Sequence, residues 1–263
     1  MSPETTCEQN VFRLHLMPSW ELWNNELSVE VSLRQQRLLA FLAVHGTCRR
    51  ELVAGALWPE SPEYCALDNL RVSIHKVSST LPDLIRADRY ALGLAPHVWV
   101  DLHKEWKVLD GIQIEEGLRR PSNAPLLSGW YEDWVIDEQS RLNRARISYW
   151  HRVASVALAS SDYIAAIEAS IQGLYLEGLD ETSLEIMVLA HLELGQCISA
   201  LQAIVEFRRR ANHELGIASS PALDRLEARV RIAAQPHVIQ PPNPVLNENS
   251  NVSLPGGRRQ GVA

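Results

Sequence analysis

The chain has 263 residues, of which 46% are hydrophobic, and its formal net charge at pH 7 is -7. This length allows one or two domains that each bury a core. Acidic residues outnumber basic residues in both 1–110 and 111–263, which counts against general nucleic-acid binding. Any contact with DNA must therefore come from a local cluster of cations that neutralises few phosphates.

The N-terminal segment and the cysteines predict a cytoplasmic protein. The first ten residues, MSPETTCEQN, contain neither the basic nor the apolar segment of a secretory signal peptide. No apolar run reaches the roughly 20 residues that would span a membrane. The four cysteines are scattered without CxxC spacing, which favours free thiols over a disulfide framework or a metal site. We therefore expect no cofactor, no metal and no membrane contact.

The first segments of the chain alternate between strand and helix signals. Residues 11–32 alternate apolar and polar side chains in three short runs, as strands do. An amphipathic helix is predicted over 33–45, and a second short helix over 49–57 ends at Trp58 and Pro59. The residues of the first helix that we expect to face inward are Leu38, Leu39, Leu42 and Ala43.

The stretch from Ser61 to Leu81 is predicted to be one helix with two different faces, begun by a Ser61 cap. Its apolar positions recur at helical spacing and indicate one buried stripe: Ala66, Leu70, Ile74, Val77 and Leu81. The opposite face carries Asp68, Arg71, Val72, His75, Lys76 and Ser79. Arginine and lysine reach guanine edges or phosphates, and valine can contact a thymine methyl group. The pattern predicts a helix that reads the major groove; an ordinary solvated surface helix is the alternative.

Short strands are predicted after this helix, at 84–86, 89–92 and 98–100. Strands, three helices and a hairpin, in that order, predict an α+β winged helix-turn-helix domain with a three-stranded sheet before the helices. In that fold the third helix enters the major groove and the hairpin tip reaches the flanking backbone. The alternative is a small α+β domain that binds only protein.

Two groups of residues are candidates for DNA contact in such a domain. Base edges would be read from the third helix by Arg71, Val72, His75 and Lys76, and Asn69 of the same helix is a further candidate for DNA contact. Contacts with the DNA backbone would come from Arg34, Ser78, Ser79, Arg86 and Arg89.

Strand signals disappear from residue 101 onwards, and an all-α, tetratricopeptide-like domain is predicted. Two helix joins, 161–163 and 195–197, lie 34 residues apart, which is the period of tetratricopeptide helical hairpins. The predicted helices are 101–109, 130–159, 162–175, 181–194, 197–215 and 220–233. We expect a DNA-binding domain over 1–100, a helical domain over 101–234 and a disordered tail over 235–263, where Pro, Asn, Gly and Ser predominate.

These stretches also resemble a known family. The first half resembles the winged-helix domain of the Streptomyces antibiotic regulatory protein (SARP) family, and the second half resembles its bacterial transcriptional activator domain. The matching segments, over roughly residues 11–233, are LRQQRLLAFLAVHG (33–46), LWPE (57–60), NLR (69–71), WVIDEQSRL (134–142) and ELGIASSPALDRLEARV (214–230).

The sequence departs from the family pattern at two places. The family usually carries arginine or lysine late in the reading helix, where this chain has Ser78 and Ser79. Its wing turn is commonly rich in glycine, whereas Asp88 and Arg89 precede Tyr90 here. These changes remove expected phosphate contacts and stiffen the wing. Since no P-loop sequence occurs, the chain resembles the short, stand-alone form of the family.

The sequence gives little support for catalysis, and we expect that the protein is not an enzyme. His103 and Glu105 are predicted to lie on an ordinary solvated helix face, and no HExxH, GxSxG or GxGxxG motif occurs. The tryptophans are predicted to be core residues, with an aromatic ligand cage as the alternative. Trp58 would pack beneath the reading helix, and the inner face of the long helix would carry Trp130, Trp134 and Trp150. The arginines at 208–210 are interpreted as contacts with the end of a helix dipole rather than a second nucleic-acid patch.

The elements and the resemblance together predict a sequence-specific DNA-binding transcription regulator that acts as an activator. The resemblance implies binding to direct repeats in promoter DNA, self-association on DNA and contact with RNA polymerase. The alternative is a helical-repeat adaptor between proteins whose winged helix no longer binds DNA. The sequence does not decide whether the helical half binds a small-molecule effector.

Overall fold

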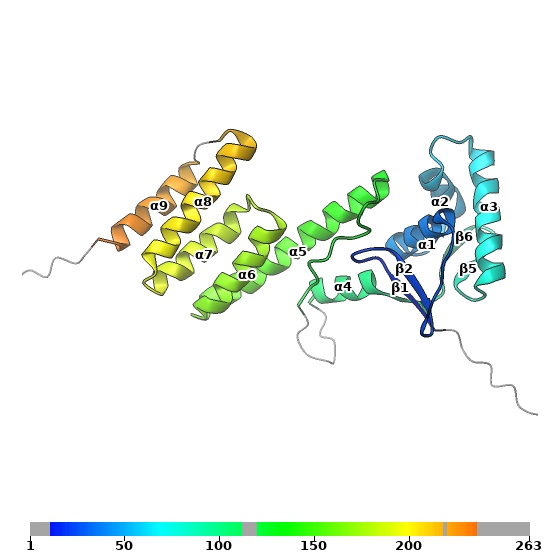
Figure 1. Cartoon of the computed structure of the whole chain (residues 1–263), viewed down its shortest axis with the longest axis horizontal. Helices are drawn as coiled ribbons and strands as arrows, with labels where there is room; N and C mark the ends of the chain where they lie inside the picture. The colour runs from blue at the N-terminus through cyan, green and yellow to red at the C-terminus, as the bar shows by residue number, and fades with distance from the viewer. Residues whose placement is uncertain (1–10, 112–119, 218–219, 236–263) are drawn as a thin grey trace, which may run out of the picture.

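A computed structural model describes residues 11–111, 120–217 and 220–235 of the chain. Its two parts lie side by side along the long axis of the molecule (Figure 1). The sheets and the helices α1 to α3 form one end, and the helices α6 to α9 stack in chain order at the other. The predicted tail lies outside the described residues, except for its first residue.

Strands from both ends of the first part form the N-terminal sheet. It contains β1 (Phe12–His15), β2 (Glu21–Asn24), β3 (Leu27–Ser28) and β7 (Trp99–Val100) in the order β3-β2-β1-β7. β1 is antiparallel to β2 and parallel to β7. The prediction of a three-stranded sheet was therefore wrong. The sequence indicated the strand at 98–100, but no local signal showed that it pairs with β1 instead of the wing.

Three helices follow β3, and the predicted inward residues of the first are all buried. They are α1 (Leu33–His45), α2 (Arg50–Leu57) and α3 (Glu63–Thr80). Leu38 and Leu42 of α1 share a core cluster with Leu70 of α3. The predicted Ser61 cap was wrong, because the extended Pro62 occupies the N-cap position and the helix begins one residue after it.

A second small sheet forms the wing. It contains β4 (Cys48–Arg49), β6 (Ala91–Leu94) and β5 (Ile85–Ala87), in that order across the sheet. β5 and β6 are the hairpin that the sequence predicted. β4 was not predicted, because two residues are too few to show alternation. Its pairing with β6 joins the wing to the start of α2.

The helical half repeats the same turn at a spacing of 34 residues. Its elements are α4 (Asp101–Leu109), α5 (Asp133–Ala159), α6 (Tyr163–Leu176), α7 (Glu181–Glu193), α8 (Cys197–Leu215) and α9 (Pro221–Ala233). Ser161 and Gly195 both have positive φ, 62° and 70°. The next N–H donates back to Ala157 O at 2.9 Å in one turn and to His191 O at 2.8 Å in the other. The predicted repeat is therefore present in the backbone geometry, although α5 begins three residues later than predicted.

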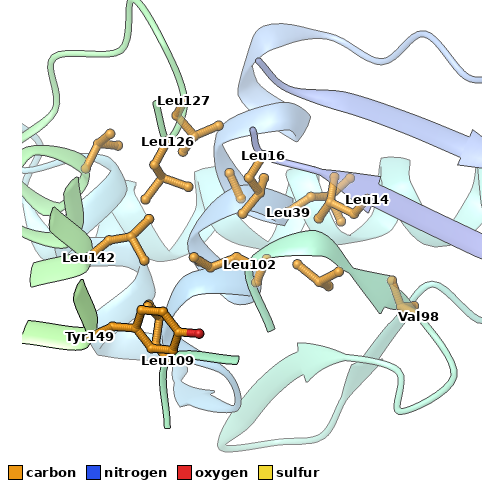
Figure 2. Packing of buried hydrophobic residues seen from close by; sticks show 14 of the residues in the cluster. Leu14, Leu16, Leu39, Val98, Leu102, Leu109, Leu126, Leu127, Leu142 and Tyr149 are labelled. Carbon is orange, nitrogen blue, oxygen red and sulfur yellow. The ribbon is translucent and has the colours of Figure 1, made fainter. Parts of the chain in front are cut away.

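One hydrophobic cluster runs through both halves (Figure 2). Leu14, Leu16 and Leu39 come from the first half. The helical half supplies Leu102 and Leu109 from α4, and Leu126, Leu127, Leu142 and Tyr149 from the segments after it. Backbone bonding adds to this contact, since the Leu127 N–H donates to Leu16 O at 2.7 Å. The boundary at 100/101 stays a prediction, and cutting the chain nearby would expose part of this shared core.

A buried ion pair lies in the same contact and corrects one prediction. Glu105 of α4 accepts from Nε of Arg146 of α5 at 2.8 Å, and these side chains are 6% and 1% exposed. The guanidinium also donates to Ala124 O, and the Glu105 carboxylate also accepts from Ser122 N. His103 Nε2 lies 2.7 Å from Ala43 O of α1. The predicted solvated face was wrong for Glu105, which is buried where α4 meets the rest of the fold, whereas His103 is exposed.

Candidate nucleic-acid interface

The helix α3 presents one buried and one exposed face, as predicted. Its buried residues are Ala66, Leu70, Ser73 and Val77. Ile74 is only half-buried, and Ser73, which bonds back to Asn69 O at 2.8 Å, fills the stripe beside it. Asn69 is half-buried at the edge of the face. The exposed candidates on α3 are Arg71, Val72, His75, Lys76, Ser78 and Ser79. The helix lies along the outer edge of the molecule, on the side away from α6 to α9 (Figure 1).

Arg71 is paired within its own helix. Its Nη1 lies 2.7 Å from Oδ1 of Asp68, one turn earlier, and the two side chains are 72% and 66% exposed. This pair engages one N–H of a guanidinium that has five. The other donors are available for the edge of a guanine or for a phosphate oxygen.

The last turn of α3 uses its hydroxyl groups internally. Ser79 Oγ donates to His75 O at 2.7 Å, and Thr80 Oγ1 donates to Lys76 O at 3.0 Å. A hydroxyl whose hydrogen is held by a backbone carbonyl cannot donate the same hydrogen to a phosphate. Ser79 is therefore a weaker candidate for backbone contact than Ser78, whose side chain is also exposed.

An aspartate holds the wing turn without glycine. Oδ1 of Asp88 accepts from Tyr90 N and Ala91 N, each at 2.7 Å. These N–H donors, first that of Ala91, hold the pKa of Asp88 below its usual range. Arg50 of α2 donates from Nε to Asp88 O at 2.9 Å. The Asp88 side chain and the Arg50 side chain thus both hold the wing turn by hydrogen bonds.

The wing places cations and an aromatic ring at the surface. Arg89 lies in the turn, with its guanidinium 5.5 Å from the Tyr90 ring centroid. The strand register puts Arg86 opposite Gly93 and Arg49 opposite Ala91, so both arginines lie on the same face of the wing sheet. Both are exposed. The cations of the wing therefore include Arg49, which the sequence reasoning missed because β4 was not predicted.

The sequence reasoning missed two further exposed residues, Tyr64 and Tyr90, and the candidate Arg34 lies on α1 instead of on α3 or the wing. Tyr64 is 70% exposed in the first turn of α3, and Tyr90 is 68% exposed at the wing turn. Helical spacing puts Tyr64 on the same face as Asp68 and Arg71. Arg34 belongs to α1, with its guanidinium 5.6 Å from the ring of Trp58, which packs half-buried against the cluster that contains Leu70. Trp58 therefore packs against a core to which α3 contributes along with α1 and α2, and its position beneath α3 itself stays a prediction.

Other candidate sites are accounted for within the fold. Arg208 of α8 pairs with Glu227 of α9 at 2.7 Å, and Arg209 pairs with Glu206 at 2.7 Å. The helix continues to Leu215, so carboxylates, and not the helix end, contact these arginines, and that interpretation was wrong. Trp150 is buried in the long helix and Trp134 is half-buried, but Trp130 precedes the helix.

The described part of the chain holds neither a metal-binding cluster nor a helix that could span a membrane. Within it, no three His, Cys, Asp or Glu side chains are grouped as a metal would need. Among the helices described, none is both long and apolar enough to cross a membrane.

Comparison with known proteins finds a family match for the helical half. Residues 122–231 match the family model of the bacterial transcriptional activator domain. The helical half is a bacterial transcriptional activator domain. The match agrees with the resemblance to SARP regulators that the sequence indicated for this part of the chain. The family is a class of regulators and not of enzymes.

The two-part fold of the chain is also found in a solved structure. The chain is similar to Mycobacterium tuberculosis EmbR, solved in complex with a low-affinity phosphopeptide, with a TM-score of 0.63 and 16% sequence identity. The match covers 85% of this chain and 66% of the EmbR chain, so this chain spans only part of that protein's length. The likeness concerns the fold, and it agrees with a winged helix followed by a helical domain. No curated protein sequence matches the chain.

Proposed function

We propose that this regulator binds a specific promoter duplex by placing α3 in the major groove and activates transcription through its helical half. One observation carries the proposal. The buried stripe of α3 fixes the helix in the core while Arg71, His75 and Lys76 stand exposed on its outer face. A helix held in this way presents its side chains to base edges at one fixed angle.

The wing supports the same placement. Its face with Arg49 and Arg86, and its turn with Arg89, supply cations beside a helix that has few of its own. Such residues suit phosphate contacts, which fix the position of a protein on the duplex without reading its sequence. The division of labour is base reading by α3 and backbone contact by the wing.

The helical half is proposed to contact RNA polymerase and a neighbouring copy of the regulator on adjacent repeats, in the cytoplasm. Weak single sites gain occupancy when bound copies touch, because each raises the effective concentration of the other. The family match to a transcriptional activator domain supports this role.

An adaptor function is favoured by a specific set of residues. Asp68 adds negative charge to the outer face of α3, and Ser78 and Ser79 stand where cations would strengthen phosphate contact. A helical-repeat adaptor between proteins would not need to bind a DNA groove, so it would tolerate these residues on α3. It would not explain the exposed arginines on the wing.

Selection from a genomic promoter library with the full-length chain separates the two functions. We expect enrichment of one sequence motif at low salt, with a log-affinity slope against log salt that reflects only about three to five neutralised phosphates. Arg209→Ala is the matched control for Arg71→Ala, since both arginines are exposed and pair with a carboxylate three residues earlier at 2.7 Å. Absence of any enriched motif at low salt would favour the adaptor.

A further inference from the structure

We propose that Asp68 is a positioning residue, whose carboxylate holds the guanidinium of Arg71 in the orientation that reads a base edge. The inference rests on the proposed function, because it assigns a role within the same α3 surface. It adds that the discrimination at one base position depends on an acidic residue that itself repels DNA.

The geometry of the pair is the first step. Nη1 of Arg71 and Oδ1 of Asp68 lie 2.7 Å apart, and the residues stand one turn apart on the outward face of α3. Recognition helices contact base edges with their N-terminal residues, and Asp68 and Arg71 lie in the first half of α3, which begins at Glu63. The pair therefore lies on the part of the helix that would approach the bases most closely.

The chemistry of arginine is the second step. A guanidinium reads guanine by donating two parallel N–H bonds to O6 and N7, which requires its plane to be aligned with the base. An unrestrained arginine side chain must be ordered on binding, and ordering beforehand removes part of that cost. A carboxylate bonded to Nη1 restricts the plane while other N–H donors stay available.

The electrostatic cost is the third step. Asp68 brings a negative charge to a surface that must approach phosphates, which lowers affinity for every duplex alike. At this exposure the pair contributes little to the stability of the helix. A residue that weakens general binding and stabilises little has its main effect on the orientation of Arg71.

The test uses the full-length chain and compares Asp68→Asn with Asp83→Asn. Asp83 is exposed in the turn after α3 at a φ of 67°, which asparagine also tolerates, so it makes the same charge change away from the pair. Binding is measured on the selected duplex, on its variants at each base position and on a scrambled duplex. Asp68→Asn should tighten binding to the scrambled duplex while lowering the preference at one position about fivefold, the lower limit for a bidentate contact.

Two companion variants sharpen the result. Asp68→Glu keeps the charge and should retain most of the preference. In an Arg71→Ala background, Asp68→Asn should leave the remaining base preference unchanged, because the residue that it positions is absent.

The outcomes that overturn the inference are distinct from failure of the proposed function. If Asp68→Asn tightens all duplexes alike and the preference is kept, or if it behaves as Asp83→Asn does, Asp68 only repels DNA and the inference is wrong. Loss of preference in Arg71→Ala alone would then leave the proposed function standing. A wild-type chain without any sequence preference would overturn both.

Discussion

Arg71 of α3 and Arg209 of α8 have almost the same local surroundings but lie in different regions. Both are largely exposed, and both pair with a carboxylate three residues earlier at 2.7 Å. Around Arg209, however, Glu206 also lies 3.8 Å from Arg210, and Arg208 pairs with Asp224 and Glu227. Around Arg71, Asp68 is the ion-pair partner, and the same exposed face of α3 continues with His75 and Ser79.

A run of arginines is therefore a poor sign of DNA binding by itself. The three consecutive arginines of α8 are more conspicuous in the sequence than the single Arg71, yet carboxylates of α8 and α9 neutralise them. Availability of a cation for phosphate or base depends on its neighbours in space, and these come from other elements.

The largest effect is expected from breaking the buried ion pair between Glu105 and Arg146, which lies where the two halves of the chain meet. Arg146→Ala leaves the Glu105 carboxylate buried without its ion-pair partner, 6% exposed. We expect a loss of about 3–5 kcal/mol in the free energy of unfolding, as for other buried pairs with one partner removed. Chemical denaturation of the full-length chain measures it, with Arg209→Ala as the control, because both Arg209 and its partner Glu206 are exposed. A loss below about 1 kcal/mol, the range of surface pairs, would contradict the buried role.

Adding positive charge to the last turn of α3 should strengthen its contact with DNA. The double change Ser78→Arg and Ser79→Arg places cations on the last turn of α3, where they also favour the helix C-terminus. We expect tighter binding to all duplexes and a salt slope steeper by about one to two units. Affinity titrations at several salt concentrations provide the measurement. An unchanged slope would mean that this end of α3 points away from DNA.

Removing one wing cation should have a smaller and less selective effect. Arg89 lies at the wing turn, with its guanidinium 5.5 Å from the Tyr90 ring centroid. Arg89→Ala should weaken binding to specific and scrambled duplexes equally and lower the salt slope by about one unit, as expected for a phosphate contact. Titration of both duplexes measures it, and a change in base preference would instead place Arg89 in a groove.

The smallest effect concerns folding. Exposed ion pairs within a helix contribute about 0.2–0.5 kcal/mol, so Arg71→Ala and Arg209→Ala should both leave the free energy of unfolding within about 0.5 kcal/mol. Denaturant titration of the two variants measures this. A larger loss in Arg71→Ala alone would show that any change in its DNA binding reflects damage to α3.

Features with local periodicity could be predicted from the sequence. The inward residues of α1, the two faces of α3 and the 34-residue repeat of the helical turns all follow from spacing within one element. The family resemblance of the helical half, which the family model matches over residues 122–231, could also be found from sequence segments. The predicted DNA contacts stay predictions.

Features that depend on distant partners could not be predicted. The strand β4 and the pairing of β7 with β1 depend on strands far away in the sequence. The pairing of Glu105 with Arg146 joins residues 41 positions apart, and a lone carboxylate on an amphipathic helix looks solvated until its partner is known. The Ser61 cap failed for a local reason, since Pro62 itself takes the N-cap position.

The most direct test of DNA reading by α3 is a paired titration of Arg71→Ala and Arg209→Ala, in the full-length chain, on the selected duplex and its single-position variants. If α3 reads the major groove, Arg71→Ala costs about 1–3 kcal/mol on the selected duplex and relaxes the preference at one base position. Arg209→Ala should leave both quantities unchanged. Equal behaviour of the two variants, with affinity and preference retained in Arg71→Ala, would contradict the assignment of this face of α3 to DNA.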